Sequence, residues 1–285
     1  MLQLWAEEPT HMHLTRTISL ATLPLALALA AGCAPRDDDE EAAAQSTTSA
    51  LQASQHGGLT EAAIDLDEGD AIEPERAAQA VAERPTKGLS PSGCATKTRE
   101  GAKVTLVMKG CTGPHGKLTL DGTLVATFTR PSPDALHVEL VGGDDLRANG
   151  QDLGYRADAD IRYEGALRRV TWHGQVSGVT KRGKSYERRT DLDIVADTAS
   201  RCLDVAGTSR GTIASWSVDV TIDRFRACED QCPTSGQIKA TVRSPGGRER
   251  SLEVTFDGSD QARVVGPRGR ELTVKMACAD GETEE

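Results

Sequence analysis

Aromatic side chains are scarce in this chain of 285 residues, which contains three Phe, three Tyr and three Trp. Because aromatic rings supply much of the stacking surface of binding sites, their scarcity argues against carbohydrate stacking. The sequence also lacks a Gly-x-Ser-x-Gly nucleophile elbow and a glycine-rich phosphate loop. It therefore carries no signal of an α/β-hydrolase or of a nucleotide-binding enzyme.

One apolar run, from about Ile18 to Ala31, lies near the start of the chain. It is shorter than the roughly 20 residues that a membrane-spanning helix needs, and Pro24 interrupts it. Met12 precedes the run together with the basic residue Arg16, whereas the first eleven residues are acidic where an export signal should be basic. We therefore predict a signal peptide over residues 1–32, with translation starting at Met12.

The apolar run ends in Leu29-Ala30-Ala31-Gly32-Cys33. Over residues 12–33 the sequence resembles a bacterial lipoprotein signal peptide, although Ala30 stands where that class most often has Leu. The resemblance implies that Cys33 becomes lipidated, that the chain is cut before it, and that acyl chains such as palmitate anchor the protein to a membrane. Ala34, at the position where Asp favours inner-membrane retention, implies the outer membrane of the cell envelope. The alternative is an ordinary secretory signal that leaves Cys33 as a free thiol.

An acidic segment follows the signal. Residues 34–89 contain 13 Asp or Glu against 4 Lys or Arg, a difference of −9 out of the net charge of −10. Such a segment buries too little apolar surface to offset its ordering entropy, so we predict a disordered tether over residues 33–89 and a disordered acidic tail over residues 280–285. A short helix over Pro74–Glu83 is the one element that Pro and Ala spacing indicates here.

The rest of the chain is balanced in charge, with 28 basic and 28 acidic residues between positions 90 and 285. Nucleic-acid binding does not follow from such a balance. Apolar residues alternate with polar ones along many short runs, which is typical of antiparallel strands with one buried face. Examples are Val104/Leu106/Met108, Tyr155/Ala157/Ala159/Ile161/Tyr163 and Val218/Val220/Ile222.

Glycine-rich and Pro-containing turns separate these runs, as short hairpins require. The sequence therefore predicts an all-β domain over residues 90–279, with roughly ten to twelve strands and almost no helix. We expect an antiparallel meander that forms a sandwich or an open curved sheet. A weak similarity between two turn-and-strand units suggests two related halves, 94–200 and 201–279.

Six cysteines follow Cys33, and an even number in an exported chain indicates disulfides. Six cysteines allow 15 pairings. We favour Cys94–Cys111, Cys202–Cys228 and Cys232–Cys278, because each pair then brackets a strand or a hairpin. Each closure would contribute about 3 kcal/mol. The rival interpretation is a metal site formed by these cysteines, which the oxidising compartment disfavours, and we predict neither a metal nor a cofactor.

Three groups of polar residues are candidate functional sites. Asp158 with Asp160, and Asp191 with Asp193, pair carboxylates about 7 Å apart along strands, a separation that suits inverting glycosidases. The histidines His115, His137 and His173 fall on different strands and turns, and a triad with Ser177 is not indicated. The densest basic cluster is a predicted anion-binding patch formed by Lys181, Arg182, Lys184, Arg188 and Arg189.

These observations predict a membrane-anchored lipoprotein whose β domain is a non-catalytic binding or structural module of the cell envelope. Its partners would be the membrane, through the lipid anchor, and an envelope protein, a glycan or a lipid. One alternative is a periplasmic hydrolase or glycan-active enzyme that uses the carboxylates of the polar face. Another is a lipid carrier with a curved half-barrel.

Overall fold

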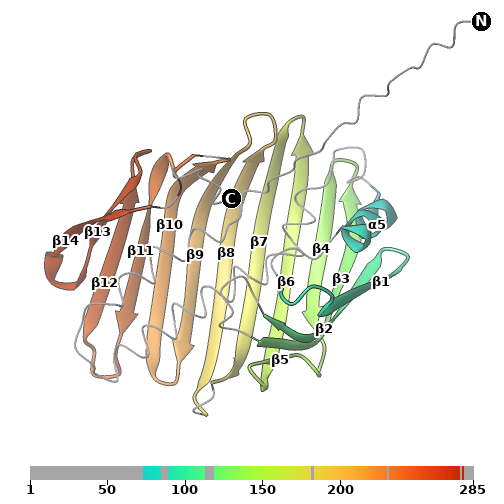
Figure 1. Cartoon of the computed structure of the whole chain (residues 1–285), viewed down its shortest axis with the longest axis horizontal. Helices are drawn as coiled ribbons and strands as arrows, with labels where there is room; N and C mark the ends of the chain where they lie inside the picture. The colour runs from blue at the N-terminus through green and yellow to red at the C-terminus, as the bar shows by residue number, and fades with distance from the viewer. Residues whose placement is uncertain are drawn as a thin grey trace, which may run out of the picture.

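The computed structural model describes residues 73–84, 89–112, 119–180, 183–229, 231–276 and 278 (Figure 1). The predicted signal peptide, Cys33, the acidic tail and most of the predicted tether lie outside the described residues.

Fourteen antiparallel strands form a single sheet (Figure 1). Each strand pairs with the next one along the chain, except that the short β5 pairs with β3 and β6, and β4 pairs directly with β6. The strands are β1 (Ala95–Glu100), β2 (Lys103–Thr112), β3 (Thr119–Ser132), β4 (Ala135–Gly142), β5 (Arg147–Ala148), β6 (Gln151–Glu164), β7 (Leu167–Val179), β8 (Ser185–Asp197), β9 (Cys202–Ile213), β10 (Trp216–Cys228), β11 (Ser235–Arg243), β12 (Glu249–Phe256), β13 (Gln261–Val265) and β14 (Glu271–Lys275).

This architecture confirms the predicted all-β meander and decides between its two forms. The strand order is a single open path from β1 to β14, so the domain is an open curved sheet and not a sandwich. The estimate of ten to twelve strands was too low. The boundary between the two predicted halves falls at the turn between β8 and β9, which pair along their whole length without a break in the sheet.

One face of the sheet is apolar and continuous from β2 to β13. Strand alternation places most of the aliphatic and aromatic side chains of β2 to β13 on this side, where most of them are buried. The most deeply buried include Val104, Phe128, Leu136, Val138, Leu140, Ile161, Val170 and Ile238. We call this side the apolar face and the opposite side the polar face.

A bulge in β10 keeps this alternation intact. The pairing of β10 shifts between Ile222 and Phe225 on the β9 side and between Asp223 and Arg226 on the β11 side, and Arg224 adopts a φ of 46°. The extra residue returns Phe225 to the apolar face, where it packs edge-on against Phe256 with 5.2 Å between ring centroids. The facing residue is Gly236, since a Cβ there would overlap the backbone of Arg224 and Phe225.

The helix α5 (Pro74–Glu83) is the one α-helix among the described residues, and it corrects the predicted tether. The sequence indicated a helix at these residues, but not that it would be packed. Ala77, Ala78 and Val81 are fully buried within the core that includes β1 to β3. Disorder up to residue 89 is therefore wrong over this helix, because its apolar stripe finds a buried surface on the sheet.

Strand β1 also binds the end of this helix. The ammonium of Lys97 donates hydrogen bonds to the carbonyl oxygens of Val81 and Arg84, at 2.9 and 3.1 Å. The carbonyls at a helix C-terminus have no partner within the helix, so a cation there is stabilising. Burial, together with the charge of Arg84, lowers the pKa of Lys97. At the other end of α5, Glu73 pairs with Arg130 at 2.7 Å.

Three disulfides are present, and they join the pairs favoured from the sequence. Cys94–Cys111 links β1 to β2, Cys202–Cys228 joins directly opposite residues of β9 and β10, and Cys232–Cys278 ties the start of β11 to the segment after β14. All six cysteines are consumed, which removes them as metal ligands.

Because one side of α5 is buried against the sheet, a charged residue on that side should destabilise the fold. Val81→Asp should lower the free energy of unfolding by roughly 2 kcal/mol or more, because an unpaired carboxylate would replace a buried methyl pair. The exposed Gln79 provides the control, since Gln79→Asp changes the helix preference and replaces an exposed hydrogen bond to Glu83 by a like-charge pair, together worth about 1 kcal/mol. Urea unfolding of both variants measures the difference, and equal losses would contradict docking.

Candidate functional site

The polar face is covered by charged side chains that pair with one another across neighbouring strands. The closest contacts are 2.6 to 2.8 Å long and extend from β4 to β14. They join Glu139 to Arg156, Gln175 to Glu187, Asp204 to Arg226, Asp219 and Glu249 to Arg243, Gln237 to Glu253, and Arg263 to Glu271.

Two histidine–aspartate pairs lie near the middle of this face. His137 of β4 bonds Asp160 of β6, and His173 of β7 bonds Asp191 of β8, each with 2.8 Å between ring nitrogen and carboxylate oxygen. Asp158 of β6 lies directly opposite His173 on its other side. We call these five residues the His–Asp cluster.

The sequence alone places His137 and His173 on different strands, without a visible partner. Each pair in fact consists of residues directly opposite one another, as the registers of β4–β6 and β7–β8 show. Directly opposite side chains have Cβ atoms about 5 Å apart, close enough for an imidazole–carboxylate bond. Counting outward from the turn at Gly165 would have placed Asp158 opposite His173, so the β6–β7 hairpin held a signal that was missed.

Surrounding carboxylates favour the charged form of His173. The hydrogen bond to Asp191 is the largest cause of the raised pKa of His173. Burial opposes it, and the charges of Asp158, Asp191 and Asp160 add to it. The imidazole is half-exposed, so water screens these interactions. The imidazole of His173 can therefore hold a proton. Together with the surrounding carboxylates it forms a surface of mixed charge.

The carboxylate pairs do not converge on a cleft. Asp158 and Asp160 lie on β6 and Asp191 and Asp193 on β8, and since β7 separates them the two pairs are about 10 Å apart across the sheet. Ser177 shares a face of β7 with His173 but lies four residues along the strand, about 13 Å away. Among the described residues, no group of three or more His, Cys, Asp or Glu side chains is placed to hold a metal ion.

Aromatic residues are partitioned by the sheet. Within the described part of the chain, every Phe, Tyr and Trp belongs to the alternation that forms the apolar face; six of these eight are buried, and Tyr186 and Trp216 are partly so. The polar face thus offers no ring on which a sugar could stack among these residues. The scarcity of aromatic residues, which argues against carbohydrate stacking, therefore applies most strongly to the polar face.

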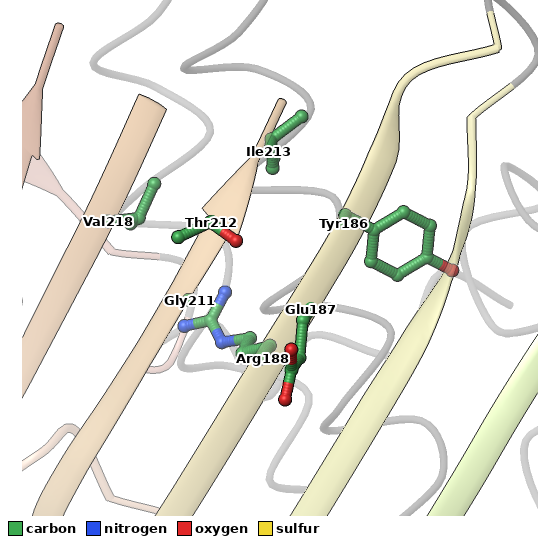
Figure 2. A pocket seen from close by; sticks show the side chains of 7 residues that line it. All are labelled: Tyr186, Glu187, Arg188, Gly211, Thr212, Ile213 and Val218. Atoms are coloured by element: carbon green, nitrogen blue, oxygen red, sulfur yellow. The ribbon is translucent and has the colours of Figure 1, made fainter. Parts of the chain in front are cut away.

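A small hollow lies on the sheet between β8 and β10 (Figure 2). Its volume is about 10 Å³, room for about one water molecule. Arg188 reaches from β8 toward Gly211 of β9, and its Nε donates a 2.6 Å hydrogen bond to the hydroxyl of Ser209. Thr190 lies 2.7 Å from the same hydroxyl. Burial lowers the pKa of Arg188 to about 10.

Side-chain alternation along β8 separates two residues of the predicted anion-binding patch. Arg188 is 8% exposed and lies on the apolar face, whereas Arg189 is exposed on the polar face, because consecutive residues of a strand point to opposite sides. Lys184 is exposed in the preceding turn, and Lys181 and Arg182 lie outside the described residues. Arg188 and Arg189 therefore do not lie on one surface.

No protein-family model matches the chain, and no curated protein matches it. None of the helices in the described residues is long and apolar enough to cross a membrane.

The His–Asp cluster predicts a specific titration. The pKa of His173 should lie above its ordinary value of about 6.5, and Asp191→Asn should bring it down because the largest favourable contact is lost. Since the folded-state pKa is raised, the stabilisation is complete below pH 6.5 and disappears as pH rises through the folded-state pKa. NMR titration of the imidazole measures the shift.

Asp204→Asn is the matched control, because it removes a carboxylate of the same face that bonds Arg226 on β10. It should leave the His173 titration unchanged. A His173 pKa that does not respond to Asp191→Asn would contradict the assigned pair.

Proposed function

We propose that this chain is an exported lipoprotein, anchored through Cys33, whose β domain binds or supports other components of the cell envelope without catalysing a reaction. The lipoprotein-like signal motivates the anchor, and three disulfides suit an oxidising compartment. The acidic segment between Cys33 and α5 gives the domain distance from the membrane surface.

The observation that carries the non-catalytic part is the state of the polar face. Many of its carboxylates, among them Asp160 and Asp191, are engaged with histidine, arginine or amide side chains of the next strand, on the face of an open sheet. Catalysis by two carboxylates requires them to converge on a reacting bond with different pKa values. An extended array of paired charges supports recognition of a partner surface better than such chemistry.

We place the centre of the partner-binding surface at the His–Asp cluster. It combines two imidazoles with three carboxylates in the middle of the polar face, so it would select a partner with complementary hydrogen-bond donors and positive charge. Lipid carriage would require an open apolar cavity large enough for acyl chains. The hollow beside Arg188 has room for about one water molecule and cannot serve as that cavity. A hydrolase receives less support because Asp158/Asp160 and Asp191/Asp193 stand apart on an open face.

The anchor can be tested on the mature N-terminus. Mass spectrometry should find Cys33 as the first residue, carrying acyl chains, and fractionation should recover the protein with the outer membrane. Ala34→Asp should move it to the inner membrane while the acyl mass is kept, and Cys33→Ser should remove the acyl mass. A mature chain with a free Cys33 thiol would overturn the lipoprotein proposal.

The binding role can be tested by capture from envelope extract with the full chain. His173→Ala combined with Asp191→Ala should abolish recovery of the captured component, because both groups lie at the proposed centre. Arg243→Ala combined with Glu249→Ala is the matched control, since it removes another cross-strand pair of the same face, on β11 and β12. Equal recovery by both variants would exclude the His–Asp cluster as the binding surface.

A further inference from the structure

The two edges of the sheet differ. At one edge α5 packs beside β1, whose Lys97 is bonded to the end of that helix. At the other edge, β14 pairs with β13 and with no other strand of the described chain (Figure 1). Four of its five residues are exposed, and Leu272 is 49% exposed, one of the few large apolar side chains so accessible. An open edge of this kind is a template for another strand.

The free backbone groups of β14 can be assigned from its pairing. Met276 donates its amide to Asp260, and Arg270 accepts from Gly266, so the even-numbered residues direct their backbone groups toward β13. Because an antiparallel ladder alternates, Glu271, Thr273 and Lys275 direct their N–H and C=O groups to the open edge. Their side chains lie on the polar face, and those of Leu272 and Val274 on the apolar face.

We propose that β14 pairs with β14 of a second copy of this chain, antiparallel and centred on Thr273. This register places Glu271 opposite Lys275 of the second copy, and by symmetry Lys275 opposite its Glu271. Leu272 then lies opposite Val274 of the second copy, which continues the apolar face from one copy to the other. All three residues with outward backbone groups meet outward groups, and each such pair exchanges two hydrogen bonds.

Charge selects this register over its neighbours. A shift that centres the pairing on Leu272 or on Val274 keeps the backbone match but separates Glu271 from Lys275 and leaves part of the strand without a partner. Opposite charges placed directly across strands are stabilising, and like charges are destabilising. The short strand is thus complementary to itself in one alignment.

Pairing through β14 alone gives an assembly of two copies. Pairing of identical edges is isologous and closes on itself, whereas β14 on β1 would generate an open filament. Strand β1 also pairs with one strand only, but α5 packs over the apolar face of β1 to β3, and Lys97 of β1 is bonded to the end of that helix. The dimer depends on β14 alone and does not rest on the proposed lipid anchor or on the His–Asp cluster.

Charge reversal tests the register. Glu271→Lys gives copies with two lysines on β14, and Lys275→Glu gives copies with two glutamates, so each variant alone should dimerise roughly tenfold more weakly than the wild type. An equimolar mixture should restore association, as a heterodimer in which every opposite pair is again Lys–Glu. Sedimentation of the full chain in detergent, with one variant tagged, measures both.

Glu271 also bonds Arg263 within one copy, so thermal unfolding of each variant is measured alongside. Heterodimer formation shows that both variants fold. Association of the wild type then identifies the antiparallel register, because parallel pairing of the wild type would place Glu271 opposite Glu271 and Lys275 opposite Lys275. A wild-type chain that is monomeric at about 100 µM, or a mixture that stays monomeric while both variants unfold like the wild type, would overturn the proposal.

A disulfide provides an independent measurement. Directly opposite residues of a hydrogen-bonded antiparallel pair have Cα atoms about 5.5 Å apart, within the range that a disulfide spans. Thr273→Cys should therefore give a covalent dimer on mild oxidation. Thr98→Cys, at an exposed position of β1, is the matched control and should stay monomeric. Cross-linking of both, or of neither, would contradict pairing through β14.

Discussion

Strand alternation is the constraint on which the rest of the structure depends. In a single open sheet, one residue of slip in any strand would carry its whole apolar set to the polar face. The chain prevents this with a meander of short turns and with the bulge at Arg224, which adds one residue and returns Phe225 to the buried side. The apolar face consequently stays continuous from Val104 to Val264.

The same alternation separates neighbours and joins distant residues. Arg188 and Arg189 are adjacent in sequence but lie on opposite faces, one buried beside Ser209 and one in solvent. His173 and Asp191 are 18 residues apart and form a 2.8 Å contact. On such a sheet, the residues that share a surface lie opposite one another on neighbouring strands. A group of like residues that are consecutive in sequence is therefore weak evidence for a common site.

The edges are stabilised in different ways, because an edge strand has only one neighbour. Near β1 the Cys94–Cys111 disulfide and α5 both add contacts, and Lys97 joins the helix to the strand. Near β14 the Cys232–Cys278 disulfide ties the end of the chain back to the start of β11, but it leaves the strand itself exposed. A helix thus packs on the sheet beside one edge, and no helix does so beside the other among the described residues.

The sequence by itself determined the all-β class, the meander, the position of α5 and the favoured cysteine pairs, because period-two patterning, Pro and Ala spacing and loop length are local properties. Only the tertiary structure decided that the sheet is open, that α5 is packed, and that His137 and His173 each meet an aspartate. These three features depend on which residues of neighbouring strands pair and on which surfaces pack together. The pairing is set by the length of every turn and the position of every bulge along the chain. The composition indicated that few aromatic side chains are present for ligand stacking. The pairing of strands decided which histidines and aspartates lie close enough to form a site.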